Sequence, residues 1–235
     1  MNVYLRIKRK KDADGPSFYQ VFLYEGEPED SVAYALNVLN SRDTLTDVNG
    51  SSADRIVWEC SCLQKKCGAC AMRIGGLPRL ACSSFLSGCM DRNSTVTLEP
   101  LSKFPVVADL KVDRNILFEN MKQLKLWLEE DAHISYWERE SQYQSARCLM
   151  CGCCLEVCPN FCPDEKFAGA VFMAAACKLL DQSSYGEHRS ELLKKYRNYY
   201  FEGCGKSFSC RHICPIGIPL EDLLVKANAM AIWRK

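Results

Sequence analysis

The chain is 235 residues long, which is enough for one or two domains with buried cores. Its formal net charge of +1 creates no long-range field that would favour nucleic acid or an anionic membrane surface as a partner. It contains 16 cysteines, yet we do not expect a secreted disulfide scaffold, because residues 1–11 alternate like a strand and lack the apolar core of a signal peptide. The longest apolar run, residues 168–177, is about half of the ~20 residues that a membrane-spanning helix needs.

The N-terminal part of the chain has the pattern of half-buried strands. Apolar and polar residues alternate on both sides of the turn signal Asp14-Gly15, which predicts a hairpin over residues 2–24. A helix is expected to follow as far as Asn40, capped by Asp30 or Ser31. Three short apolar stretches predict further strands: 56–58, 71–74 and 96–98. A hairpin, a helix and then more strands is the order of a β-grasp sheet.

The composition changes near residues 100–105, and beyond them helical spacing replaces the alternation. Apolar residues that recur on one helical face predict four helices, over residues 117–128, 167–180, 190–199 and 220–232. We therefore predict an α+β protein with two domains. The first is a β-grasp domain at residues 1–105, and the second is an all-α domain at residues 106–235.

Four cysteines of the first domain have the spacing of a plant-type [2Fe–2S] centre. The set reads Cys62-x4-Cys67-x2-Cys70-x11-Cys82. Gly68 lies between two of these ligands, where the backbone has to approach the cluster closely. Cys60 precedes the set, but its use would replace the x4 spacing by x6, so we interpret it as a non-ligand. The first domain is thus expected to be a plant-type ferredoxin domain.

The second domain contains two cysteine runs that end in Cys-Pro. The first is Cys148-x2-Cys151-x2-Cys154-x3-Cys158-Pro159, a bacterial ferredoxin signature, and the second is Cys204-x5-Cys210-x3-Cys214-Pro215. In that signature the fourth cysteine ligates the other cluster, so the two runs are expected to cross. A [4Fe–4S] cluster then takes Cys148, Cys151, Cys154 and Cys214, and the other centre takes Cys158, Cys204 and Cys210.

The second of these centres lacks a fourth thiolate. A complete cubane motif would have a cysteine at position 207, where this chain has Ser207. Three thiolates predict a [3Fe–4S] centre with one iron fewer. The alternative is a [4Fe–4S] cluster with the Ser207 oxygen as its fourth ligand, which the preference of iron–sulfur clusters for soft sulfur ligands disfavours.

Five cysteines have no ligand role in this scheme: Cys60, Cys89, Cys153, Cys162 and Cys177. Free cysteine usually packs as a small apolar side chain, which is what we expect here, although Cys153 stands out because it lies between ligands. Of the histidines His133, His188 and His212, only His212 lies between ligands, where it is a candidate to tune a cluster potential or to pass protons. No GxGxxG, Walker or HExxH motif is present, so no flavin or nicotinamide site is expected on this chain.

Taken in this order, the three cysteine sets resemble one family, the iron–sulfur subunit of succinate dehydrogenase and fumarate reductase. The resemblance covers nearly the whole chain and extends beyond the cysteines. The matching segments are Ser61-Cys62, Cys67-Gly68-Ala69-Cys70-Ala71-Met72, Leu80-Ala81-Cys82, Glu99-Pro100-Leu101, Pro105-Val106, Asp109-Leu110, Val112-Asp113, Cys151-Gly152-Cys153-Cys154 and Lys166-Phe167.

The resemblance implies an electron-transfer subunit of a succinate:quinone oxidoreductase or quinol:fumarate reductase. In this family a separate flavoprotein subunit holds FAD and interconverts succinate and fumarate. Electrons pass along [2Fe–2S], [4Fe–4S] and [3Fe–4S] clusters to or from (mena)quinone at a membrane-anchor subunit, with or without heme b. The implied location is peripheral, on the cytoplasmic face of a bacterial or archaeal cell membrane. No catalytic residue and no nucleic-acid partner is implied for this chain.

Two positions depart from the family pattern. Members that bind ubiquinone often carry Trp shortly after the first Cys-Pro, where this chain reads Asn160-Phe161-Cys162-Pro163. Gly205 stands where such members often have His. One alternative is therefore a soluble reductase of fumarate, or of another unsaturated acid, with a non-quinone electron partner. Another is a cluster-bearing sensor without a catalytic partner, which the absence of a nucleic-acid patch disfavours.

Overall fold

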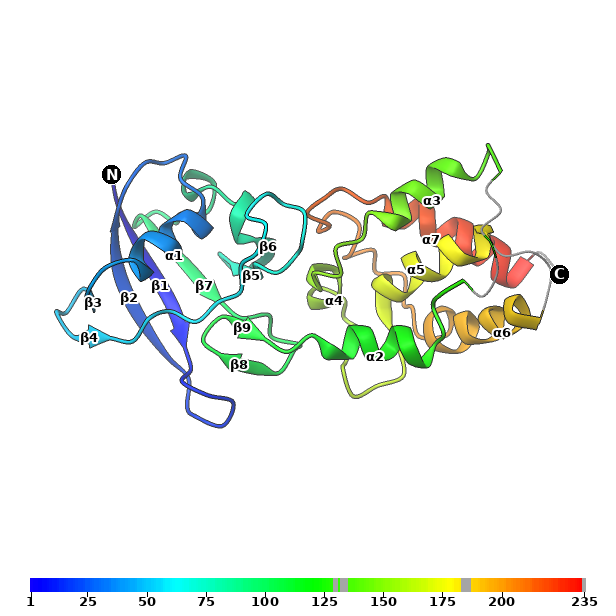
Figure 1. Ribbon diagram of the computed structural model, residues 1–235, viewed down its shortest axis with the longest axis horizontal. Helices are drawn as coiled ribbons and strands as arrows, with labels where there is room; N and C mark the ends of the chain where they lie inside the picture. Colours follow the sequence, from blue (N-terminus) through cyan, green and yellow to red (C-terminus); the bar gives the residue numbers. More distant parts are fainter. Residues whose placement is uncertain (129–130, 132–134, 183–186, 234–235) are drawn as a thin grey trace. The chain divides into compact units, whose positions relative to one another are not determined.

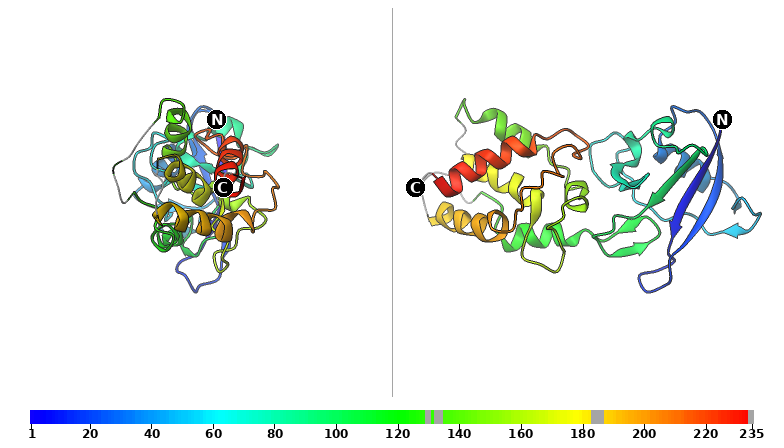
Figure 2. Two further views of the ribbon diagram at one scale, coloured as in Figure 1. Left: turned by 90° about the vertical axis from the view of Figure 1, so that its right-hand side faces the viewer. Right: turned by 180° about the vertical axis from the view of Figure 1, so that it is seen from behind.

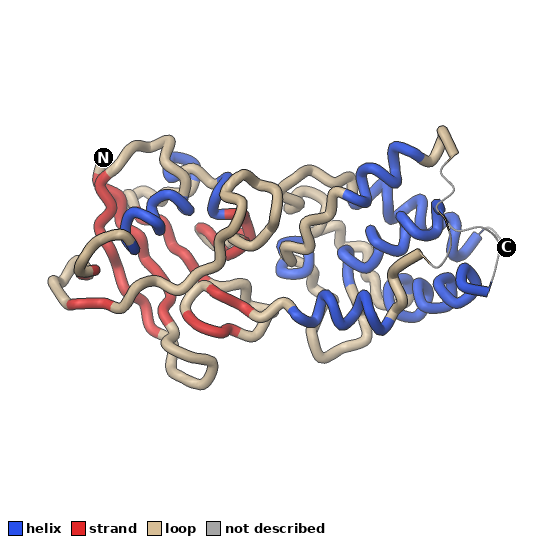
Figure 3. Tube along the Cα trace, viewed as in Figure 1, coloured by secondary structure: helices blue, strands red, loops and turns tan. Residues whose placement is uncertain are grey.

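The computed structural model describes residues 1–128, 131, 135–182 and 187–233. The chain forms two compact units, Met1–Asp113 and Arg114–Lys235, called unit 1 and unit 2 below. The strands β1 to β9 all belong to unit 1, and unit 2 is helical (Figures 1 and 3). The α+β organisation predicted from the sequence, a sheet followed by a helical region, is confirmed.

Unit 1 is built on a five-stranded sheet with the strand order β2-β1-β7-β5-β6. Its strands are β1 (Asn2–Arg9), β2 (Phe18–Glu25), β5 (Ala71–Ile74), β6 (Leu77–Leu80) and β7 (Thr95–Glu99). Strands β1 and β2 form the predicted antiparallel hairpin, whereas β1 and β7 run parallel. Because side chains alternate between the two faces of a strand, Val3, Leu5 and Ile7 of β1 are all fully buried.

Helix α1 (Val32–Asn40) lies across one face of this sheet (Figures 1 and 2). Of the two predicted caps, Ser31 is the one used: its hydroxyl accepts a hydrogen bond from the Tyr34 N–H at 3.1 Å. Leu36 and Leu39 are fully buried, so the apolar side of the helix completes the core over β1.

Strand β6 lies in a stretch for which the sequence predicted no strand. Gly75 and Gly76 both have positive φ, +59° and +83°, as a two-residue hairpin turn of type I′ requires. Pro78 is tolerated in β6 because β6 is an edge strand of the sheet. Short elements complete unit 1: β3 (Leu45–Thr46), β4 (Ser52–Ala53) and the 3₁₀ turns η1 (Ala81–Ser83) and η2 (Leu86–Gly88).

Residues 56–58 do not form the strand that the sequence predicted, because side chains take up their backbone groups. The Asn40 amide accepts from the Ile56 N–H and donates to the Ile56 carbonyl, both at 2.8 Å. The Val57 N–H donates to Asp109 Oδ2 at 2.8 Å. With these groups already satisfied, no sheet ladder is needed.

A short hairpin, β8 (Val106–Ala108) and β9 (Lys111–Val112), follows the predicted boundary at residue 105 and belongs to unit 1. Asp109 in its turn explains this. The Asp109 carboxylate forms a buried ion pair with Arg9 at 2.9 Å and accepts the Lys10 N–H, also at 2.9 Å. These bonds hold the hairpin against the end of β1, so unit 1 extends to Asp113.

Unit 2 is organised around α5 (Gly169–Gln182), which packs against the other helices and is buried on nearly every side. The others are α2 (Asn115–Gln123), α3 (Arg139–Ala146), α4 (Cys153–Glu156), α6 (Glu187–Tyr196) and α7 (Leu220–Asn228), with π-helical turns η3 (Arg197–Phe201) and η4 (Ala229–Trp233). Helix α2 ends before the predicted residue 128, because Lys125 has a φ of +52°. No described helix has both the length and the apolar character needed to cross a membrane.

Helix α3 was absent from the sequence prediction because its buried residues are polar. Gln142 and Ser145 are buried, while Tyr143 is exposed. Its Ser141 hydroxyl bonds the carboxylate of Asp181 on α5, which is also paired with Lys226 of α7 at 2.7 Å. The Ser141–Asp181 and Lys226–Asp181 contacts therefore link α3, α5 and α7 through polar groups.

Candidate iron–sulfur sites

The four predicted ligands of unit 1 lie around one loop. Three of them precede β5 and Cys82 follows β6, in η1. Because Ala71 pairs with Leu80, the β5–β6 hairpin brings Cys70 and Cys82 together at its open end. The Ala81 N–H also donates to the Cys70 carbonyl at 3.1 Å. We call Cys62, Cys67, Cys70 and Cys82 the unit 1 set.

Backbone amides of the loop point at sulfurs of this set. The N–H groups of Gln64 and Lys66 both donate to Cys62 Sγ at 3.3 Å, and the Lys65 N–H donates to Cys82 Sγ at 3.3 Å. The two amide bonds, that of Gln64 first, lower the pKa of Cys62 to about 7. The loop therefore favours the thiolate form that binds iron.

Cys70 and Cys60 differ in burial. Cys70 is buried, and burial raises the pKa of its thiol to about 12, so a free thiolate would be costly there and a metal-bound one would be favoured. Cys60 is exposed, so the predicted packing role for it is wrong.

In unit 2, the start of the first cysteine run lies against the end of the second. Arg147, next to Cys148, donates from Nη2 to the Ile216 carbonyl at 2.7 Å, shortly after Cys214. Burial raises the pKa of Cys148, and the charges of neighbouring thiolates, including Cys214, raise it further. We call Cys148, Cys151, Cys154 and Cys214 the four-thiol set.

The end of the first run lies against the start of the second. Asn160, shortly after Cys158, donates from Nδ2 to the Gly203 carbonyl at 3.0 Å, immediately before Cys204. Burial raises the pKa of Cys210, and the charges of Cys158 and Cys204 add to the rise. We call Cys158, Cys204 and Cys210 the three-thiol set. Within unit 2 the two runs thus lie against each other start to end, and the assignment of their sulfurs to two sets stays a prediction.

The cysteine loops share a left-handed backbone. Eight described residues other than glycine have positive φ, and five of them lie in these loops: Leu63, Lys65, Met150, Lys206 and Phe208. This conformation is uncommon outside glycine, and it turns successive N–H groups toward one point, where they bind anions. Ser207 lies exposed in the loop of the three-thiol set, and its Oγ accepts a hydrogen bond from Ser209 Oγ at 3.3 Å.

Among the described residues, no three His, Cys, Asp or Glu side chains approach closely enough to hold one metal ion. A single ion with metal–sulfur bonds of about 2.3 Å needs sulfurs about 3.8 Å apart. A Cys₄ [2Fe–2S] cluster binds two thiolates at each iron and a [4Fe–4S] cluster binds one, so the ligands of a cluster are shared among several metal atoms. All the cysteines are free thiols, so no disulfide competes with this interpretation.

Two residues near the sulfurs make contacts that the spacing of the cysteines could not predict. Cys153 is fully buried, and a hydrogen bond from its side chain lowers the pKa of Cys151 to about 7, so it does more than pack. The Tyr200 hydroxyl lies 3.7 Å from Cys204 Sγ. Both contacts depend on how the chain folds back on itself, which no spacing rule contains.

The remaining cysteines and histidines lie apart from these contacts. Cys177 is buried in α5, and burial raises its pKa to about 12, as expected for a packing role. Cys89 accepts a hydrogen bond from Arg79 Nη1 at 3.4 Å, and Cys162 is half-buried. His212 is exposed, His188 lies in α6, and His133 lies outside the described residues.

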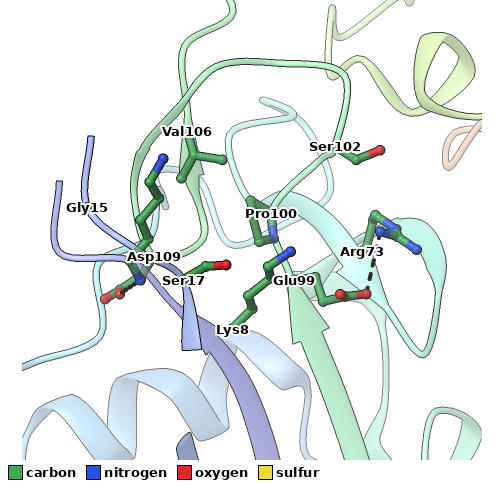
Figure 4. A pocket seen from close by; sticks show the side chains of 10 residues that line it. Lys8, Gly15, Ser17, Arg73, Glu99, Pro100, Ser102, Val106 and Asp109 are labelled. Carbon is green, nitrogen blue, oxygen red and sulfur yellow. Dashed lines mark hydrogen bonds and ion pairs between the residues drawn. The ribbon is translucent and has the colours of Figure 1, made fainter. Parts of the chain in front are cut away.

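Unit 1 also has a pocket of about 240 Å³ whose lining contains no cysteine (Figure 4). Lys8, Ser17 and Arg73 contribute to it, and Arg73 forms an ion pair with Glu99 at 3.5 Å. Its other carboxylate, Asp109, is held by Arg9. The pocket is thus separate in composition from the sulfur sets, which are the candidate functional sites.

Comparisons with known proteins give a consistent picture. Residues 3–119 match a family model described as a 2Fe-2S iron-sulfur cluster binding domain. The chain is 31% identical to the succinate dehydrogenase iron-sulfur subunit of Bacillus subtilis, over 94% of this chain and 89% of that protein. It is 27% identical to the fumarate reductase iron-sulfur subunit of Wolinella succinogenes, over 87% of this chain and 85% of that protein.

A solved structure shares the fold over nearly the whole chain. A chain of the Mycobacterium smegmatis Sdh1 complex in the apo form superposes with a TM-score of 0.80 at 22% identity. The match covers 99% of this chain and 97% of that chain. Both units described above therefore have a counterpart in one known chain.

Proposed function

Because this chain belongs to the family of succinate dehydrogenase and fumarate reductase iron–sulfur subunits, we propose that it carries electrons between a flavoprotein subunit with FAD and (mena)quinone at a membrane-anchor subunit. When bound, iron–sulfur clusters accept and release single electrons. The grouping of the sulfurs in unit 2 carries this proposal, since it joins two distant runs in the way a two-cluster ferredoxin requires.

Unit 1 is proposed to be a β-grasp domain of the plant-type ferredoxin kind, with the unit 1 set as ligands of a [2Fe–2S] cluster. The parallel pairing of β1 with β7, the helix across the sheet and the family match over residues 3–119 support this. The amides that donate to Cys62 and Cys82 would stabilise the negative charge of the bound thiolates.

Unit 2 is proposed to be an α-helical ferredoxin domain that holds a [4Fe–4S] cluster on the four-thiol set and a [3Fe–4S] cluster on the three-thiol set. The absence of a thiol at Ser207 supports the smaller cluster. Burial of the Cys154 thiol raises its pKa most, and the charges of Cys151 and Cys148 and then of Cys210 raise it further, which supports a location of the two sets next to each other within unit 2. Adjoining sets suit the passage of electrons from one to the other.

The catalytic flavin site is proposed to lie on the partner chain, as in a succinate:quinone oxidoreductase or quinol:fumarate reductase. The chain would bind peripherally at the cytoplasmic face of the cell membrane, through the anchor subunit. The relatives include a succinate dehydrogenase subunit and a fumarate reductase subunit, so succinate oxidation and fumarate reduction are both proposed directions.

One observation favours a second candidate, a soluble fumarate or related reductase with a non-quinone partner. Gly205 lies against the Asn160 side chain, whose nearest atom is 3.1 Å from the place a Cβ would occupy. A His at this position, as ubiquinone-binding members often have, would require the Asn160 side chain to move.

Purification from native membranes tests these candidates. A flavoprotein and a multi-span anchor that co-elute with the chain would support the first candidate, and a flavoprotein without an anchor would support the second. Electron paramagnetic resonance (EPR) of the same material, reduced and oxidised, should show three distinct centres. Material free of iron and acid-labile sulfide would overturn both candidates.

A further inference from the structure

Tyr200 is buried next to Cys204, one of the ligands of the three-thiol set. The Cys204 N–H donates to the Tyr200 carbonyl at 2.9 Å, so a helical turn places the two side chains on the same side of the backbone. The Tyr200 hydroxyl and Cys204 Sγ are hydrogen-bonded at 3.7 Å. Within the described part of the chain, this is the one hydrogen bond that the hydroxyl makes.

Packing fixes the Tyr200 ring in this position. Its residue is 2% exposed, and its ring stacks on Phe167 at a centroid distance of 5.6 Å and lies against Tyr196 at 5.3 Å. A buried hydroxyl needs a hydrogen-bond partner, and bulk water does not reach this one. The contact with Cys204 is therefore a persistent part of the fold.

The direction of this hydrogen bond follows from the state of the sulfur. A cysteine that ligates iron has lost its proton, so the hydroxyl must be the donor and the thiolate the acceptor. A donor on a ligand sulfur stabilises the more negative, reduced state more than the oxidised one. Hydrogen bonds to the sulfurs are among the factors that set cluster potentials.

We propose that Tyr200 is a positioning residue that raises the reduction potential of the cluster held by Cys204, through a hydrogen bond from its hydroxyl to Cys204 Sγ. This inference rests on the proposed function for the presence of a cluster there, whether that cluster has three irons or four. The residue that adjusts the reduction potential thus lies on this chain, four residues before the ligand Cys204.

The chain offers a matched control for the removal of this hydroxyl. Tyr196 lies one turn earlier, is also fully buried, and donates to Asn228 Oδ1 at 2.8 Å. Tyr196→Phe and Tyr200→Phe thus each delete one buried hydroxyl from neighbouring rings. Only the second deletion removes a bond to a ligand sulfur.

The experiment is a redox titration of the full chain, isolated with its native partners and followed by EPR. Tyr200→Phe should keep the signal of the three-thiol centre and lower its midpoint potential, while the potentials of the other two centres stay unchanged. Tyr196→Phe should leave all three unchanged. An unshifted potential in Tyr200→Phe, or an equal shift in both variants, would overturn the inference.

A second measurement covers the case in which Tyr200→Phe does not fold. Incorporation of 3-fluorotyrosine at position 200 keeps the ring and makes the hydroxyl a stronger donor, so the midpoint potential should rise; no rise would overturn the inference. Cys204→Ser separates this test from that of the proposed function. If the wild-type protein shows no iron signal that depends on Cys204, the ligand assignment itself fails, and Tyr200 has no cluster to tune.

Discussion

The buried ion pair between Arg9 and Asp109 is predicted to be a principal source of stability in unit 1. Their side chains are 6% and 4% exposed, and Arg9 also donates to Gln20 Oε1 and to the Asp54 and Arg55 carbonyls. Arg9→Met would leave the carboxylate buried without its cation and three acceptors without their donor. Removal of one partner of a buried pair costs about 3–5 kcal/mol, and we expect about 4 kcal/mol here.

Native-state hydrogen exchange of the buried β1 amides measures this loss without global unfolding, which is rarely two-state in a protein with cofactors. A loss of about 4 kcal/mol corresponds to an exchange rate about 1000-fold higher. Lys11→Met is the matched control, because the Lys11–Asp54 pair spans 4.0 Å with side chains that are 77% and 83% exposed. We expect this control to change stability by less than about 1 kcal/mol.

Two results would refute this reasoning. If Arg9→Met changes the exchange of β1 by no more than Lys11→Met does, burial of the pair has no special consequence. If both variants accelerate exchange strongly, the positive charge at this end of β1 determines its stability, and the burial of the ion pair does not. A separate outcome is faster exchange in the β8–β9 hairpin with unchanged exchange in β1. It would mean that the Arg9–Asp109 pair stabilises the hairpin and not β1.

Three further substitutions test the sulfur sets and the β5–β6 turn. Ser207→Cys should supply a fourth thiolate and convert the [3Fe–4S] centre to a cubane, so the oxidised protein should lose its [3Fe–4S] EPR signal; persistence of that signal would contradict the ligand set. Cys214→Ser should damage the cluster of the four-thiol set and spare the other, and the reverse outcome would show that the crossing is wrongly drawn. Gly76→Ala should destabilise the β5–β6 hairpin by about 1 kcal/mol, because φ is +83° and only backbone strain is added. Gly88→Ala, at a position with equally open space and no positive φ, should leave hydrogen exchange of that hairpin unchanged.

The parts of the fold that sequence predicts are those with a regular apolar period. Alternation in β1 follows directly from the burial of every second residue, and the long apolar, Ala-rich run of α5 follows from its central position. Helix α3 was not predicted because the residues that it buries, Gln142 and Ser145, are polar and give no apolar period. Residues 56–58 mislead because their apolar side chains suit a strand, while Asn40 takes the backbone bonds that a strand would need.

The sulfur sets were predictable because cluster ligation restricts how far apart ligands are along the chain, and that restriction is visible as spacing. Ser207 was visible for the same reason, as an exception within the spacing. The contacts of Cys153 and Tyr200 were not, because a hydrogen bond to a ligand sulfur depends on rotamers and on neighbouring rings. Sequence therefore yields a candidate set of ligands, and packing determines which hydrogen bonds their sulfurs receive.

The interleaving of the two runs in unit 2 has a consequence for biosynthesis. A ribosome that has translated Cys158 has made three thiols of one set and one of the other, and neither group is complete. Cys214 is made last, and its sulfur accepts a hydrogen bond from the Ile218 N–H at 3.4 Å, just ahead of α7. Under the proposed ligand assignment, the four-thiol set is therefore complete only when translation has passed Cys214, after the three-thiol set was completed at Cys210.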